Sequence, residues 1–219
     1  MIKNEFLKRI LSSIILLLLF YLVMSQSLII ISVFLIFCLC AVLYEWHNMS
    51  KKKKYYYIGI IFIIFSFYSA YKLLSFDSNY QYFLLVLIIC ISTDIGGYIF
   101  GKFFKGPKLT SISPNKTYSG ALGGFIFSLT SIFFLDSSYY FSNIPEVFNN
   151  IILITILIST VSQVGDIAIS YFKRLSNVKD TGKIIPGHGG LLDRIDGMLF
   201  AFPFLYILIS SNLLKPLYL

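Results

Sequence analysis

Charged residues are scarce in this chain. They make up 13% of its 219 residues, while hydrophobic residues make up 57%, and the mean hydropathy is +0.81. A soluble domain carries about 25% charged residues. Such an apolar excess cannot be buried inside one soluble core, so the composition excludes a soluble globular domain and predicts an integral membrane protein.

Cysteine is rare as well. Cys38, Cys40 and Cys90 all lie inside apolar runs, so the sequence offers neither a disulfide framework nor a zinc spacing. The alternating pattern of a membrane β-barrel is also missing, which favours helices. No small-residue cleavage site follows the first apolar run, residues 10–24, so we expect a retained helix there rather than a signal peptide.

What the chain has instead is a series of long apolar segments. About seven of them are long enough to cross roughly 30 Å of hydrocarbon. They lie near residues 8–24, 27–46, 55–76, 80–100, 119–136, 149–171 and 195–213. The predicted fold is an all-α polytopic membrane protein with about seven transmembrane helices.

Basic residues set the predicted orientation. With the N-terminus in the cytoplasm, every lysine and arginine except Lys72 and Lys215 falls on the cytoplasmic side. This asymmetry explains most of the net charge of +8 without a nucleic-acid partner, so anionic lipid surfaces and cytoplasmic anions are the expected partners. We expect a multi-pass protein of the cell (inner) membrane, in which the lysine run 51–54 anchors the topology.

Ionisable residues within membrane spans are candidates for function, because burying a charge in lipid is unfavourable. In a first polar block, residues 92–106, Asp94 lies within an apolar stretch, where it serves either function or a structural hydrogen bond. Gly97 and Gly101 are four residues apart on one helix face, which suits the close approach of a second helix.

A second polar block, residues 111–124, has a chain break at Pro114 and a predicted helix start at residues 119–120. Hydroxyl, amide and ammonium groups precede that start, on Ser113, Asn115, Lys116 and Thr117. Free N–H groups at a helix N-terminus beside a lysine can bind an anion. Gly120 and Gly124 repeat the small-residue spacing.

The third polar block spans residues 162–196. One helix face carries Gln163, Asp166, Ser170 and Lys173, and a second carries Asp193 and Asp196. Carboxylate clusters with oxygen-only partners suit Mg²⁺ or a similar hard cation. Basic groups stand around them on Lys173, Arg174, Lys179, Lys183, His188 and Arg194. This combination predicts a polyphosphate site, to which the PGHGG turn at 186–190 offers backbone N–H groups.

Residues 170–196 closely resemble the signature of the phosphatidate cytidylyltransferases, also called CDP-diacylglycerol synthases. The signature runs Ser-x-x-Lys-Arg, Lys-Asp-x-Gly, Pro-Gly-His-Gly-Gly and Asp-Arg-x-Asp. It is met here by Ser170, Lys173, Arg174, Lys179, Asp180, Gly182, Pro186, Gly187, His188, Gly189, Gly190, Asp193, Arg194 and Asp196. With upstream blocks, the resemblance covers roughly residues 90–200. We therefore expect N-terminal transmembrane helices in 1–85 and a catalytic transmembrane region in 86–219.

Two positions depart from the family pattern. Ser119 follows the Lys-Thr-aromatic triplet, and Ile169 precedes the signature serine, where the family often has Glu. The resemblance therefore implies no carboxylate from these two positions. The rest of the catalytic pattern is complete.

The resemblance implies a nucleotidyltransferase that converts CTP and phosphatidate to CDP-diacylglycerol and pyrophosphate at the cytoplasmic membrane face. Its expected cofactor is Mg²⁺, alone or with a second cation. We expect Asp166 and Asp193 to be the principal ligands, with Asp196 as a third ligand or as a group that orients them. The expected partners are CTP, phosphatidate and membrane lipids, and the resemblance implies a homodimer.

Other site residues follow from the same resemblance. Lys173, Arg174, Lys179 and Arg194 would hold the phosphates of CTP and pyrophosphate, and His188 would contact phosphate or protonate the leaving group. Further substrate contacts are expected from Ser113, Asn115, Lys116, Thr117, Ser170, Asp180, Gly189 and Gly190. For the first four of these, the phosphatidate head group and the nucleotide both remain open. Asp94 would orient their loop.

Two other functions fit parts of the pattern. A CTP-dependent membrane lipid kinase would transfer the terminal phosphoryl group and release CDP. An anion or nucleotide transporter would need charged residues near the bilayer midplane. The polar blocks cluster at one membrane face instead, which favours an active site open to the surface.

Overall fold

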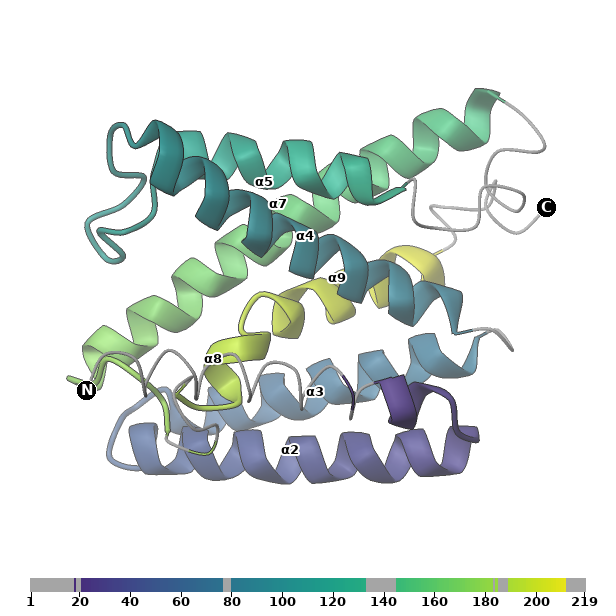
Figure 1. The fold of residues 1–219 in the computed structure, drawn as a ribbon. Coiled ribbons are helices and arrows are strands. Elements are labelled where there is room, and N and C mark those ends of the chain that lie inside the picture. Colours follow the sequence, from purple (N-terminus) through teal and green to yellow (C-terminus); the bar gives the residue numbers. More distant parts are fainter. Residues whose placement is uncertain are drawn as a thin grey trace. The chain divides into compact units, whose positions relative to one another are not determined.

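The computed structural model describes residues 18, 21–76, 80–132, 145–182, 184 and 189–211, with the backbone alone for 145–150. Its helices are α2 (Leu28–Ser50), α3 (Tyr56–Ser75), α4 (Gln81–Phe104), α5 (Tyr118–Ser131), α7 (Pro145–Leu175), α8 (Leu192–Ile195) and α9 (Met198–Ser210) (Figure 1). The described residues form helices and connecting loops without an extended β-strand, and Lys108 and Thr117 form an isolated antiparallel bridge.

Four of the described helices are long and apolar enough to cross a membrane: α2, α3, α4 and the 151–175 part of α7. They match four predicted spans and confirm a helical membrane protein. The predicted spans 119–136 and 195–213 coincide with shorter helices, α5 of 14 residues and α9 of 13 residues. The predicted span 8–24 lies mostly outside the described residues, so the count of about seven stays a prediction.

The chain divides into two compact units. The first comprises Met1–Tyr71 and Phe172–Ile195, and the second comprises Lys72–Tyr171 and Asp196–Leu219. Each unit therefore combines segments that are distant in sequence, and most of the predicted signature belongs to the first. The predicted functional division after residue 85 stays a prediction.

In the first unit, the turn between α2 and α3 is held to the last turns of α7 by aromatic packing. Trp46 is 2% exposed and lies edge-on to Phe172, with 5.6 Å between ring centroids. Its indole N–H donates to the carbonyl of Tyr56 at 3.1 Å. Gly59 leaves the space that this indole fills, since a Cβ there would overlap the ring. Lys53 also donates to the carbonyl of Leu175 at 2.8 Å.

In the second unit, α4 and α5 pack along a seam of glycines. A Cβ at Gly96 would overlap the carbonyl oxygen of Gly123, and a Cβ at Gly120 would lie 2.8 Å from the carbonyl oxygen of Gly97. Such close approach of two backbones is possible only without side chains. The predicted packing role of Gly120 is therefore confirmed, whereas Gly97 contributes its backbone carbonyl, and a Cβ there would meet only an ordinary contact at 3.7 Å.

Two further contacts fix α7 and α9 against α4. The hydroxyl of Thr93 in α4 donates to the hydroxyl of Ser159 in α7 at 2.9 Å, and both residues are buried. Phe83 in α4 stacks on Phe202 in α9, with ring centroids 5.0 Å apart. The Thr93 hydroxyl also bonds to the carbonyl of Ile89 in its own helix at 2.8 Å, so the pair adds a polar contact between two helices that are otherwise joined by apolar packing.

We expect Gly123→Ala to lower the Tm of the purified protein in detergent by roughly 2–12 °C, the range for overpacking of about 1–3 kcal/mol. The added Cβ would overlap Phe100 and lie 2.8 Å from the Gly96 carbonyl oxygen. Gly97→Ala is the matched control, because its Cβ would lie 3.7 Å from the nearest atom. An equal Tm for both variants would contradict the proposed seam.

Candidate active site

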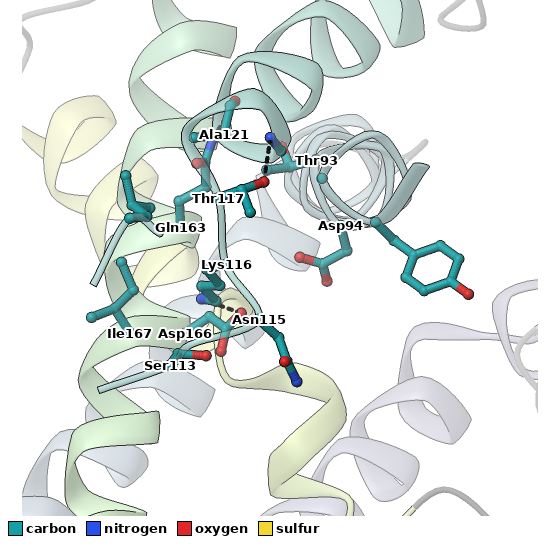
Figure 2. A pocket seen from close by; sticks show the side chains of 14 residues that line it. Thr93, Asp94, Ser113, Asn115, Lys116, Thr117, Ala121, Gln163, Asp166 and Ile167 are labelled. Carbon is teal, nitrogen blue, oxygen red and sulfur yellow. Dashed lines mark hydrogen bonds and ion pairs between the residues drawn. The ribbon is translucent and has the colours of Figure 1, made fainter. Parts of the chain in front are cut away.

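A pocket of about 290 Å³ lies in the second unit, between α4, the loop before α5, α5 itself and α7 (Figure 2). Asp94 enters it from α4, Asn115 and Lys116 from the loop, and Asp166 from α7. Two of the three predicted polar blocks, 92–106 and 111–124, thus meet at one cavity with part of the third.

The loop 105–117 is closed by its own backbone. Leu109 N–H donates to the carbonyl of Lys116 at 2.8 Å, and Lys116 N–H donates to the carbonyl of Ser113 at 3.0 Å. Thr117 then caps α5, because its hydroxyl oxygen accepts from Gly120 N–H at 3.1 Å. These bonds confirm the predicted polar loop before a helix, which begins at Tyr118.

Ser119, one of the two departures from the family pattern, has a local structural contact. Its hydroxyl donates to the carbonyl of Lys105, which directly follows α4, and pairs with the hydroxyl of Thr117 at 3.0 Å. The serine therefore ties the end of α4 to the start of α5. Ile169, the other departure, is 3% exposed and belongs to the core.

An ion pair joins the loop to α7 inside the pocket. The Lys116 ammonium contacts the Asp166 carboxylate, and the two side chains are 24% and 28% exposed (Figure 2). Ser170 donates to the other carboxylate oxygen of Asp166 at 3.4 Å. A partly exposed pair contributes little to stability, so both groups remain exchangeable with a ligand.

The pocket walls offer oxygen donors of several kinds. Asp94 and Asp166 supply carboxylates, Asn115 an amide, and Ser113 and Thr117 hydroxyls. Hard cations such as Mg²⁺ take this type of ligand. Among the residues that the structure describes, no three acidic, histidine or cysteine side chains gather as a complete metal cage. Mg²⁺ commonly takes only one or two protein carboxylates and completes its shell with water and phosphate, so the donor set fits such a cation.

In the first unit, the signature segment is organised around Asp193. Its carboxylate accepts from the Lys173 ammonium at 2.9 Å, from Thr181 N–H at 2.9 Å and from Gly190 N–H at 3.1 Å. Burial raises the pKa of this carboxyl, but the hydrogen bonds and the Lys173 charge outweigh it and hold the pKa below its usual value. Asp193 is therefore ionised at physiological pH.

Glu45, which lies in α2, is a buried acid that was not among the predicted site residues. It is 1% exposed and accepts from the hydroxyl of Thr181 at 3.1 Å. It also accepts from the backbone N–H groups of Leu191 and Leu192, at 2.9 and 2.8 Å. An acidic residue near the end of an apolar run was the available signal, and the rule that selected Asp94 selects Glu45 as well.

Gly189 and Gly190 are required by the conformation of this segment. Gly189 has φ +87°, which favours glycine. A Cβ at Gly190 would lie 2.7 Å from a carboxylate oxygen of Glu45. The structure thus explains glycine at both positions, while their predicted contact with substrate stays a prediction, and Lys183 and His188 lie outside the described residues.

The remaining predicted site residues are placed as follows. Arg174 is exposed and donates to the carbonyl of Val178 at 3.2 Å. Lys179, Asp180 and Arg194 are exposed. Asp196 is 8% exposed, follows α8 and accepts from Gly197 N–H at 2.9 Å. The structure thus brings together Lys173 with Asp193 in the first unit and Lys116 with Asp166 in the second.

We expect the stabilisation from Asp193 to depend on pH. Because its pKa is lowered by folding, its contribution is fully present above the ordinary carboxyl pKa of 3.8 and is lost as the pH falls through the lowered value. The Tm difference between the wild type and Asp193→Asn should therefore be large at pH 7 and shrink below about pH 4. Asp180→Asn, at an exposed aspartate nearby, is the control. A pH-independent difference would contradict the assignment.

Comparison with known proteins agrees with the signature. Residues 55–212 match the model of the cytidylyltransferase family. A phosphatidate cytidylyltransferase of Rickettsia bellii is 36% identical over 215 residues, which cover 94% of this chain and 91% of the relative. One of Rickettsia typhi is 38% identical over 172 residues, 74% of each chain. One of Bacillus subtilis is 38% identical over 157 residues, 70% of this chain and 56% of the relative. The similarity thus begins well before residue 90, where the motif-based resemblance placed its start.

Proposed function

The chain belongs to the cytidylyltransferase family, and from this premise we propose that it is a phosphatidate cytidylyltransferase. It converts CTP and phosphatidate to CDP-diacylglycerol and pyrophosphate in phospholipid biosynthesis. The observation that carries the proposal is the 36% identity to the Rickettsia bellii enzyme over 94% of this chain.

The reaction needs positioning more than proton transfer. A phosphate oxygen of phosphatidate attacks the α-phosphorus of CTP, and the bond from that phosphorus to the bridging oxygen of the β-phosphate breaks. The nucleophile is already an anion, so no strong base is required. The difficulty is to bring two anions together and to disperse the charge on pyrophosphate, which fixed cationic groups can do.

The Lys116–Asp166 pair supports a phosphate-binding role for the pocket. Lys116 is held by the closed loop, and its ammonium is already desolvated in part. A substrate phosphate can replace Asp166 as its partner. Lys173, Arg174, Lys179 and Arg194 are proposed to bind the phosphates of CTP and pyrophosphate, with His188 as a phosphate contact or proton donor.

Magnesium is the proposed cofactor, alone or with a second cation. Asp166 is one proposed ligand of the cation. Its support is the oxygen-rich lining of the pocket around it, which suits Mg²⁺. Asp193 and Asp196 are proposed ligands on the strength of the sequence signature. When bound, the cation would neutralise phosphate charge.

The arrangement in the membrane is proposed from the charge pattern. About seven spans, a cytoplasmic N-terminus and an active site at the cytoplasmic face of the cell (inner) membrane agree with the distribution of lysine and arginine. We also propose that the protein forms a homodimer and that it does not bind nucleic acid. A lipid kinase or a transporter is not favoured, because the relatives that cover most of this chain carry the cytidylyltransferase name.

The first test is product formation by the purified protein in detergent with CTP, phosphatidate and Mg²⁺. We expect pyrophosphate release that depends on phosphatidate and stops when the cation is chelated. Release of CDP without pyrophosphate would indicate the kinase instead. Folded protein that yields neither product would overturn the proposal.

The second test is Lys116→Ala, which removes the ammonium from the pocket. We expect kcat/KM to fall roughly 100-fold, the size of effect seen when one preorganised charge-stabilising group is lost. The Tm should change little, since the ion pair is partly exposed. Lys52→Ala, at an exposed lysine of the 51–54 run, is the control. Unchanged kinetics for both substrates would remove Lys116 from the site.

A further inference from the structure

Glu45 connects α2 to the signature segment of the first unit, although 146 residues separate it from Leu191. One carboxylate oxygen accepts from Leu191 N–H, and the other accepts from Leu192 N–H and from the Thr181 hydroxyl. Residues 181–182 and 189–192 form two arms of this segment, and Glu45 binds both.

Asp193 holds the same two arms through different groups. It accepts from the backbone N–H of Thr181 in one arm and of Gly190 in the other, and it also binds Lys173. Thr181 thus donates its hydroxyl to Glu45 and its N–H to Asp193. The arms are fixed by two carboxylates, only one of which belongs to the signature.

The space for Glu45 is built by glycines of the signature. A Cβ at Gly182 would lie 2.6 Å from one carboxylate oxygen of Glu45, and a Cβ at Gly190 would lie 2.5 Å from the other. Side chains on these arms would therefore expel the Glu45 carboxylate. Gly190, which the sequence suggested for phosphate approach, and Gly182 both leave room for an acidic side chain.

We propose that Glu45 is a positioning residue for nucleotidyl transfer. It fixes the two arms, and thereby holds the Lys173–Asp193 pair in the geometry that the reaction requires. A buried carboxylate is stable only when donors satisfy it, so the arms and Glu45 order one another. This inference rests on the proposed function, because it gives Glu45 a role in that reaction.

The sharpest variant is Glu45→Gln, which preserves shape but replaces one acceptor oxygen with an NH₂ donor. In either orientation of the amide, that donor faces the N–H of Leu191 or Leu192, so one backbone group loses its acceptor. We expect kcat to fall roughly 10- to 100-fold, as for small displacements of a reacting site. Both KM values should stay within about threefold, because no substrate contact is removed.

Thr181→Val provides an independent variant in case Glu45→Gln fails to fold. It removes the hydroxyl donor to Glu45 but retains the N–H that donates to Asp193. We expect a smaller fall in kcat in the same direction. In the double variant the two effects should not multiply, because both act through one carboxylate.

Ser50→Ala is the matched control in α2. Ser50 is fully buried, and its hydroxyl bonds only to the carbonyl of Trp46 one turn earlier among the contacts of the described residues. We expect wild-type kcat from this variant. The Tm of each variant separates loss of fold from loss of positioning.

Amide hydrogen exchange supplies a readout that does not need activity. Glu45→Gln should accelerate exchange in residues 181–182 and 189–193, with α5 unchanged. A normal kcat would overturn the inference. So would a loss of activity that follows a general loss of Tm without local acceleration. Wild-type protein that releases no pyrophosphate would overturn the proposed function instead, and the exchange data would still decide whether Glu45 holds the arms.

Discussion

A carboxylate in apolar surroundings must be met by hydrogen-bond donors, and the first unit is arranged around this requirement. Glu45 is almost completely buried, and its donors come from a segment that follows α7. That segment has its own partly buried acid, Asp193, whose backbone donors lie on the same two arms. Each carboxylate receives its hydrogen bonds only when the two arms adopt this conformation. The polar groups therefore specify the conformation of the loop more narrowly than apolar packing would.

In the second unit, helix packing rather than a buried carboxylate places the functional groups. It brings a lysine close to an aspartate. The glycine seam lets the backbones of α4 and α5 touch, and the Thr117 cap fixes where α5 begins. The loop before the cap then presents Lys116 to Asp166 of α7. A weak, partly exposed ion pair is thus held in place by strong, buried backbone contacts, which is a suitable arrangement for groups that exchange partners with a ligand.

Several features could be read from the sequence because they depend on local order. Hydropathy identified the long helices, and the spacing of Gly97 and Gly101 predicted a close helix contact that the structure contains. The hydrogen-bond partners of Glu45 could not be predicted from the sequence, because they are distant along the chain and no local pattern indicates them. The contact between Lys116 and Asp166 was missed for the same reason, since the sequence assigned one to substrate and the other to metal.

Trp46 is the only tryptophan of the chain and directly follows Glu45. Its ring is buried between Tyr55 and Phe172, and its N–H is bonded to a backbone carbonyl. The protein therefore contains a single intrinsic fluorophore of that kind, one residue from the acid that holds the signature arms. Its emission wavelength responds to the polarity and hydrogen bonding around the indole, so the unmodified chain carries an optical reporter of order in its first unit.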